Sequence, residues 1–270
     1  MMTAETSSLF SLFVVLLLLA NVSRNNAFVA PSLHGKAVTT TTTSTTNSNN
    51  NIKSPSRRPC EDTALFCGLI AVVSNVWDES SAKSSTNKAD HELFHEDVLH
   101  RTTAMLDHRG PDGMTVHTDV GQNWGMGHTR LAIVDPENRK ADMPFRLDFG
   151  KQDGHIIHLV ANGEIYNHQA LYEEMVQDQE NPWTHERYSG SDCEVIAHAY
   201  AKYGGPDMVQ KLDGMFAFCL LQEDKETGEI TDAFAARDPV GIKPLYVGVK
   251  QGTYVFASEL KALVGHVDPS

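Results

Sequence analysis

Cys67 opens a short apolar run, residues 67–73, and is our candidate nucleophile. A cysteine thiol with a reference pKa of about 8.5 is mostly protonated at neutral pH, so a catalytic cysteine needs a base beside it. If Cys67 became the first residue of a processed chain, its own α-amine, with a pKa of about 7.7 to 8.0, would be that base. The alternative is a buried core cysteine at the start of a strand, since free cysteine is among the most buried residue types.

Asn162 and Gly163 follow the apolar run 156–161. A side-chain amide and a glycine backbone N–H that point at the same place form an oxyanion hole, which stabilises the charge that develops when a nucleophile attacks a carbonyl. The alternative is an ordinary Asn-Gly turn after a strand.

Two charged residues could hold an amino acid. Arg130 interrupts the apolar stretch 127–135, and its planar guanidinium suits a carboxylate bidentately; an internal salt bridge is the alternative. Asp192 stands at the predicted start of a helix, where it could accept an α-ammonium group. Helix capping by Ser191 or Asp192 is the alternative there.

Residues 91–95 (HELFH) match the two-histidine zinc motif H-E-x-x-H and could in principle bind a metal. A zinc site requires a third protein ligand, and no glutamate occurs between Glu96 and Glu137. We therefore predict no metal and interpret this stretch as a solvated helix face. Cys193 and Cys219 are predicted to be core cysteines. All four cysteines are expected to be free thiols, because their spacing fits neither a disulfide framework nor a zinc pattern.

The composition excludes one class of partner. The 270 residues carry a formal charge of −13, with a pI near 5.4. No basic helix or Arg/Lys stripe could track a phosphate backbone, so we expect no nucleic-acid partner.

The first 66 residues have the composition of targeting segments. Residues 9–20 form an apolar run of about 12 residues, too short for a stable membrane span of roughly 20 but suited to a signal peptide within 1–27. Residues 28–66 are rich in Thr, Ser and Asn, as in a transit peptide or propeptide. The junction AFVAP at 27–31 resembles the two-part plastid signals of diatoms and related algae. We predict entry into the secretory pathway and plastid delivery; secretion and a cytosolic location are the alternatives.

The elements that must position these residues begin at Cys67. Apolar runs alternate with Gly, Pro and Asp over about 200 residues, enough for one sizeable core in a domain at 67–270. Helices are predicted at 91–107, 169–178 and 192–203, and strands at 67–73, 156–161, 215–222, 230–237, 245–249 and 253–258. So many strands favour an α+β sandwich in which two sheets form the core and helices pack outside.

Eight segments, in order and spacing, resemble the glutaminase half of glutamine-hydrolysing asparagine synthetases, a class II glutamine amidotransferase domain. They are 67–70 (CGLI), 108–112 (HRGPD), 128–135 (HTRLAIVD), 162–168 (NGEIYNH), 190–194 (GSDCE), 212–218 (LDGMFAF), 237–246 (RDPVGIKPLY) and 256–263 (FASELKAL). The resemblance implies an N-terminal-nucleophile hydrolase fold, a four-layer αββα sandwich of two antiparallel sheets. It also implies that glutamine is hydrolysed to glutamate and ammonia for asparagine synthesis.

The resemblance assigns roles residue by residue. Cys67 is the nucleophile, and Asn162 and Gly163 hold the oxyanion. Arg130 binds the substrate α-carboxylate, Asp192 and Glu164 bind its α-ammonium, and the backbone of Leu131, Ala132, Ile133 and Val134 lines the pocket. Arg109 is expected to be structural or to lie at the edge of the pocket. The glutaminase half needs no cofactor, whereas ATP and Mg belong to the synthetase half.

Two departures from the family bear on function. Phe66 precedes Cys67, so the Cys67 nitrogen is a non-basic amide until proteolysis frees it, and we expect the precursor to be inactive. The family's pyrophosphate-binding Ser-Gly-Gly-x-Asp-Ser loop does not occur in 1–270, so we expect a synthetase domain or subunit elsewhere to accept the ammonia. A second copy of the chain is a further candidate partner. The alternatives are another class II amidotransferase, of the sugar-phosphate or phosphoribosyl type, and a non-catalytic glutamine-binding remnant.

Overall fold

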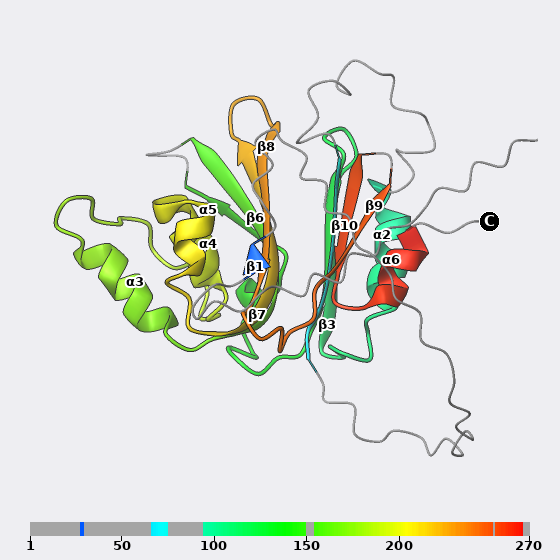
Figure 1. Cartoon of the computed structure of the whole chain (residues 1–270), viewed down its shortest axis with the longest axis horizontal. Helices are drawn as coiled ribbons and strands as arrows, with labels where there is room; N and C mark the ends of the chain where they lie inside the picture. The colour runs from blue at the N-terminus through cyan, green and yellow to red at the C-terminus, as the bar shows by residue number, and fades with distance from the viewer. Residues whose placement is uncertain (1–27, 30–65, 75–93, 150–153, 251, 267–270) are drawn as a thin grey trace, which may run out of the picture.

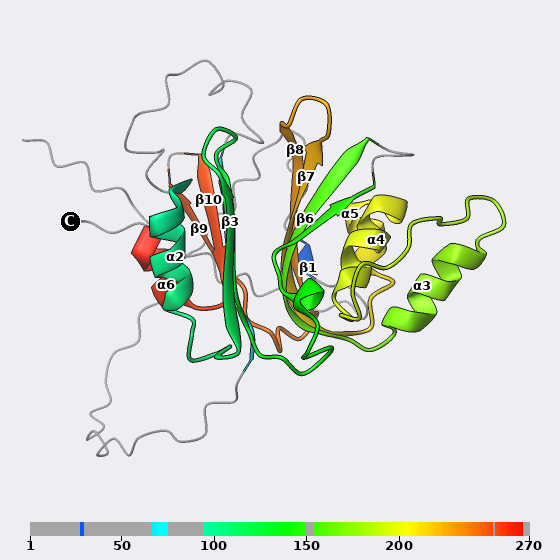
Figure 2. The same ribbon diagram turned by 180° about the vertical axis from the view of Figure 1, so that it is seen from behind.

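The computed structural model describes residues 28–29, 66–74, 94–149, 154–250 and 252–266. In these residues two five-stranded sheets face each other, with helices outside both (Figures 1 and 2). This arrangement confirms the predicted αββα sandwich. The signal-like and transit-like segments fall outside the described residues, apart from Phe28, Val29 and Phe66.

Every strand pairing within the two sheets is antiparallel. The first sheet has the order β1 (Phe28–Val29), β8 (Ile230–Arg237), β7 (Gly214–Asp224), β6 (His155–Ile165) and β5 (Phe145–Asp148). The second has the order β3 (Gly113–Asp119), β4 (Trp124–Arg130), β2 (Gly68–Ser74), β10 (Thr253–Ala257) and β9 (Tyr246–Lys250). The second sheet therefore combines three strands from the earlier part of the described chain (β2, β3 and β4) with its last two strands (β9 and β10).

The helices divide between the two outer faces (Figure 1). The first sheet is covered by α3 (His168–Gln177), α4 (Glu194–Tyr203) and α5 (Gly205–Val209). The second is covered by α2 (Glu96–Ala104) and α6 (Leu260–His266), and the short 3-10 helix η2 (Arg139–Ala141) lies in the connection from β4 to β5.

Strand β2 shows why the sequence opens on an unbroken apolar run. Side chains alternate between the two faces of a strand, so a strand in the middle of a layered sandwich must be apolar on both. Leu69 and Val73 pack into the core between the sheets, whereas Ile70 and Val72 pack with residues of α2 and α6. Cys67 stands immediately before this buried strand.

Strand β6 is longer than the sequence predicted. It continues through Ile165, so Asn162 and Gly163 lie within the strand and pair with Ala217 and Phe216 of β7. The Asn-Gly turn that we kept as an alternative is therefore wrong. A Cβ atom at Gly163 would lie 2.3 Å from the Met215 carbonyl oxygen, so β7 passes too close for any other residue.

Two helix predictions also need correction. Helix α4 begins at Glu194, and its N-cap residue is Cys193, which makes no side-chain capping hydrogen bond. Neither Ser191 nor Asp192 therefore caps it, and both side chains remain available for other contacts. Helix α2 begins at Glu96, inside the predicted range 91–107.

Among the helices of the described residues, none combines the length and the apolar character that a membrane span requires.

Candidate active site

A pocket opens between the two sheets beside the start of β2. It collects side chains from sequence positions that lie far apart. Its lining comprises Phe66, Cys67, His128, Arg130, Leu131, Ile133, Val134, Ala141, Met143, Asn162, Gly163, Glu164, Ser191, Asp192, Cys193 and Lys243. Among the ten predicted site residues, only Ala132 is outside this lining.

Cys67 is held at the pocket by backbone contacts. The Leu131 N–H lies 3.3 Å from the Cys67 sulfur, a donor that favours a thiolate. On the other side, the Arg109 Nε donates to the Cys67 carbonyl oxygen at 3.1 Å. Arg109 also forms an ion pair with Glu259 at 3.0 Å, and it is not among the residues that line the pocket.

Burial and charge act in opposite directions on the Cys67 thiol. Burial raises its pKa, because a thiolate is poorly solvated away from water. The hydrogen bond from Leu131 and the positive charges of Lys243, Arg130 and Arg109 lower the pKa, but burial dominates. As it stands, Cys67 therefore needs a base to become a nucleophile, which is consistent with the requirement for a free α-amine.

The Asn162 side-chain amide is a buried donor without a hydrogen-bond partner among the described residues. Its residue is 1% exposed, and its Nδ2 is unsatisfied within the part of the chain that the structure describes. Leaving a buried amide unpaired costs about 1–3 kcal/mol, and such groups in native proteins call for an explanation. A substrate oxyanion in the pocket would supply the missing acceptor.

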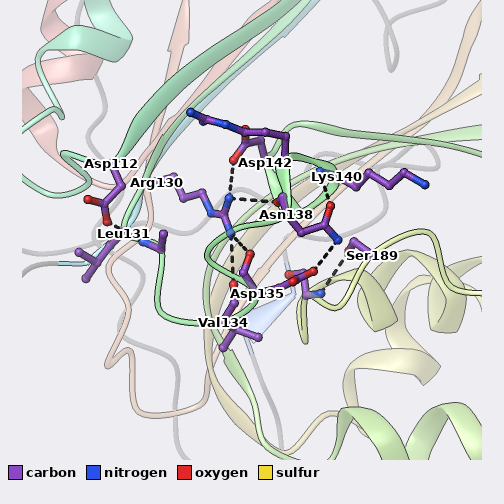
Figure 3. A network of polar contacts seen from close by, with 12 residues as sticks. Asp112, Arg130, Leu131, Val134, Asp135, Asn138, Lys140, Asp142 and Ser189 are labelled. Atoms are coloured by element: carbon purple, nitrogen blue, oxygen red, sulfur yellow. Dashed lines mark hydrogen bonds and ion pairs between the residues drawn. The ribbon is translucent and has the colours of Figure 1, made fainter.

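Arg130 organises the loop that follows β4 (Figure 3). Its Nη1 pairs with Asp142 Oδ1 at 2.6 Å, and its Nη2 donates to the carbonyl oxygens of Val134 and Asp135 at 3.2 and 2.7 Å. Asp135 in turn accepts from Asn138, so the loop is held at several points. The internal salt bridge that we named as an alternative is present, and a substrate carboxylate would share this guanidinium with Asp142.

The loop after Arg130 presents an apolar wall. Ile133 and Val134 line the pocket and are 63% and 38% exposed, which is unusual for such side chains. Ala132 is oriented by its N–H, which donates to Asp112 Oδ2 at 2.8 Å. An apolar wall of this kind suits the methylene groups of a small substrate.

Two carboxylates line the pocket, Glu164 from β6 and Asp192 from the segment just before α4. Asp192 is 7% exposed, and its Oδ2 accepts from the Ile165 N–H at 2.7 Å, which ties the start of α4 to the end of β6. Glu164 lines the pocket from β6 itself, next to the oxyanion candidates. The structure therefore brings both predicted carboxylates to the same pocket.

Sequence reasoning assigned no site role to two basic residues of the lining, Lys243 and His128. Lys243 is buried at 2% exposure, and its Nζ lies 3.6 Å from the centre of the Phe66 ring. His128 is fully buried, and its Nε2 lies 3.1 Å from the Ala161 carbonyl oxygen in the other sheet. The signal that could have pointed to Lys243 is its place as a lysine within the run 239–246 (PVGIKPLY).

Two of the three remaining cysteines lie in the described residues, and both are core cysteines as predicted. Cys193 and Cys219 are buried and free, and burial raises the pKa of both thiols well above the ordinary value. Cys193 nevertheless touches the site, since its Sγ lies 3.6 Å from the Gly163 carbonyl oxygen. Cys60 and residues 91–93 of the H-E-x-x-H match lie outside the described residues. Within the described residues, no three His, Cys, Asp or Glu side chains cluster as a metal site would require.

The chain matches a family model for the glutamine amidotransferase domain over residues 67–270. It is 41% identical over 200 residues to asparagine synthetase [glutamine-hydrolyzing] 3 of Arabidopsis thaliana, and 39% identical over 202 residues to asparagine synthetase [glutamine-hydrolyzing] of Zea mays. Each match covers 73% of this chain but only 28% of the relative, so the chain corresponds to little more than a quarter of these proteins.

A solved structure shares the fold at a lower level of similarity. It is described as the allosteric regulatory enzyme of purine biosynthesis, and it matches with a TM-score of 0.50 and 20% identity. The match covers 74% of this chain and 43% of the other. At this identity the likeness concerns the architecture alone, whereas the family match extends over most of the sequence. The chain therefore belongs to the glutamine amidotransferase domain family.

Proposed function

We propose that this chain, once cut before Cys67, hydrolyses glutamine to glutamate and ammonia. One observation carries the proposal: the Cys67 sulfur and the unpartnered Asn162 Nδ2 line the same pocket. A nucleophile beside a vacant buried donor is the arrangement that acyl transfer requires. The matched relatives are named as glutamine-hydrolyzing, which agrees with this chemistry.

The mechanism follows from the positions of these groups. The free α-amine of Cys67 takes the thiol proton, and the thiolate attacks the side-chain carboxamide carbon of glutamine. The oxyanion that forms accepts from the Asn162 amide and the Gly163 N–H. The protonated α-amine then gives its proton to the departing ammonia, and water hydrolyses the thioester to glutamate.

The opposite walls of the pocket fit the two ends of an amino acid. Asp192 and Glu164 hold the α-ammonium by charge, and Arg130 holds the α-carboxylate while it keeps Asp142 as a second partner. Ile133 and Val134 cover the methylene groups. This assignment keeps the carboxamide end of glutamine for Cys67.

We propose further that the ammonia supports ATP-dependent conversion of aspartate to asparagine by a synthetase domain or subunit. The names of the matched relatives support this acceptor over a sugar phosphate or phosphoribosyl pyrophosphate. The glutamine half needs no cofactor in this proposal, and ATP and Mg are assigned to the synthetase. A second copy of the chain remains a candidate partner.

Delivery and maturation form a separate proposal. The leader at 1–66 directs the chain into the secretory pathway and on to a plastid, and proteolysis between Phe66 and Cys67 completes the site. In the uncut chain the Phe66 side chain lines the pocket, so the cut would both create the α-amine and remove an obstruction.

The direct experiment uses the full chain with an engineered protease site before Cys67. Release of glutamate and ammonia is measured before and after the cut, with Cys67→Ala treated identically as the control. We expect turnover only in the cut chain that retains Cys67. Glutamine binding without turnover in that chain would instead support the binding remnant, and turnover by the Cys67→Ala chain would exclude Cys67 as the nucleophile.

A further inference from the structure

Lys243 is a buried cation inside the pocket to which neither the predictions nor the mechanism above assign a role. It is 2% exposed, and its Nζ lies over the Phe66 ring at 3.6 Å from the centroid. Among the described residues, this Nζ forms no hydrogen bond or ion pair. A lysine so deeply buried is almost always paired, so its position requires a reason.

The backbone around Lys243 is built to hold it there. Asp238 is buried, and its carboxylate accepts from the N–H groups of Ile242 and Lys243 at 2.9 and 3.0 Å. The same carboxylate accepts from the Phe216 N–H of β7 at 3.3 Å. The loop after β8 is therefore anchored to the sheet next to the oxyanion strand, and it directs Lys243 into the pocket.

Three cations lie near the Cys67 sulfur, but only one of them lacks a carboxylate partner. Arg109 is paired with Glu259, and Arg130 is paired with Asp142. These carboxylates offset much of the positive potential that the arginines exert on the sulfur. Lys243 keeps its full charge toward the pocket, and it is the strongest of the three cations in its effect on the thiol.

The cut before Cys67 would change the surroundings of Lys243. Phe66, which now covers the ammonium group, would leave, and the Cys67 α-amine would take the place of the peptide nitrogen. The charged end of Lys243 would then face the two groups that must exchange a proton at the start of the reaction.

We propose, on the basis of the function proposed above, that Lys243 is a positioning residue that acts through Cys67. Its positive charge stabilises the thiolate that forms when the α-amine takes the thiol proton, and it disfavours protonation of that amine by solvent beforehand in the cut chain. A nearby cation disfavours a second positive charge and favours a negative one, so both effects follow from the same charge. Lys243 would thus prepare both the Cys67 sulfur as nucleophile and the Cys67 α-amine as base.

Other titratable groups face this pair and must be considered in any pH measurement. They are Arg109, Arg130, Glu164, Asp192, Cys193, Asp238 and the buried His128. Burial lowers the Lys243 pKa, whereas the negative charges of Glu164 and of the Cys67 thiolate raise it. Protonation of Lys243 and ionisation of Cys67 therefore support each other. The buried His128 is neutral near pH 7, because burial lowers its pKa to about 4.

The test follows alkylation of Cys67 by iodoacetamide as a function of pH in the cut chain, without glutamine. Mass spectrometry of the Cys67 peptide separates this thiol from Cys193 and Cys219. In Lys243→Met we expect the pH midpoint to rise by about one pH unit, with alkylation roughly tenfold slower below both midpoints. Lys243→Arg should restore most of the wild-type profile. Lys225→Met is the matched control, because it removes an exposed lysine whose ion pair with Asp148 lies elsewhere.

An unchanged midpoint in folded Lys243→Met would overturn the proposal. If that variant fails to fold, Lys243→Gln is measured in its place, with the same expected midpoint and the same contradicting result. The pH profile of glutamine hydrolysis separates this inference from the proposed function. Turnover in wild type with equal alkylation profiles in all variants refutes the Lys243 role alone. Absence of turnover in wild type refutes glutamine hydrolysis, and the alkylation profiles still decide the role of Lys243.

Discussion

Two loops close the pocket, and they are anchored in opposite ways. After β4, the loop that carries Ile133 and Val134 is held by hydrogen bonds from the Arg130 guanidinium, a cation that donates to carbonyl and carboxylate oxygens. After β8, the loop that carries Lys243 is held by hydrogen bonds to the Asp238 carboxylate, an anion that accepts from backbone N–H groups. Both anchors are largely buried, at 7% and 2% exposure.

The difference lies in what each anchor leaves for the pocket. In the first loop the anchor and the pocket cation are the same residue, so under the proposed function the charge of Arg130 would serve the fold and the substrate together. In the second loop the anchor is Asp238 and the pocket cation is Lys243, so the two tasks are separable. Substitutions should therefore affect stability and substrate binding together in the first loop, but separately in the second.

The largest effect is expected from Asn162, which lies in β6 and belongs to neither loop. Its substitution should affect the reaction alone, so it gives a reference against which the effects of the two loops are compared. Asn162→Ala should lower kcat for glutamine by about 10²- to 10³-fold, or about 2.7–4 kcal/mol, because one oxyanion donor is lost. KM should change little, since this donor acts in the transition state. Steady-state glutaminase kinetics measure both, and an unchanged kcat would remove Asn162 from the oxyanion hole.

Arg130→Gln tests the double task of the first loop. Removing the guanidinium leaves Asp142 without its partner, and we expect the free energy of unfolding to fall by about 2–4 kcal/mol. KM for glutamine should rise at the same time. Urea denaturation and glutaminase kinetics on the same preparation give the two values. A loss of stability with KM unchanged would show that Arg130 serves the loop alone.

Asp238→Asn tests the separated tasks of the second loop. The amide loses the charge and one acceptor oxygen, so we expect the free energy of unfolding to fall by about 1.5–3 kcal/mol. KM for glutamine should stay near wild type while Lys243 keeps its place. Urea midpoints and KM are again measured together, and a rise in KM as large as that of Arg130→Gln would erase the contrast between the loops.

His128 gives the smallest expected effect, through pH. Burial lowers its pKa from 6.5 to about 4, so the unfolded chain binds a proton between these values that the folded chain does not. This contribution to stability is present above pH 6.5 and is lost as the pH falls toward 4, with about 2 kcal/mol lost between pH 7 and pH 5. His128→Gln should show a correspondingly smaller acid loss in urea unfolding. Equal acid losses in both proteins would contradict this assignment.

The layers of the fold were accessible from the sequence because the apolar runs are long and strands are numerous. Cys67, Asn162 and Asp192 were also accessible, since their motifs are local. The length of β6 was not, because an Asn-Gly pair has the local signature of a turn. Its pairing with β7 overrides that signature.

Lys243 was missed for a different reason. Its place in the pocket depends on Asp238, five residues earlier, and on the Phe216 N–H in a neighbouring strand. Such a contact between distant segments leaves no pattern in the residues around Lys243. The Asp142 partner of Arg130 was missed for the same reason, since it returns to the guanidinium only after a loop.

The central claim is that Cys67 becomes the first residue of the working protein. N-terminal sequencing or intact mass of the protein from its own cells tests this most directly. We predict a chain that starts at Cys67, with the α-amine that the mechanism requires. A mature chain that retains Phe66 or begins earlier would leave the thiol without its base and would contradict the account.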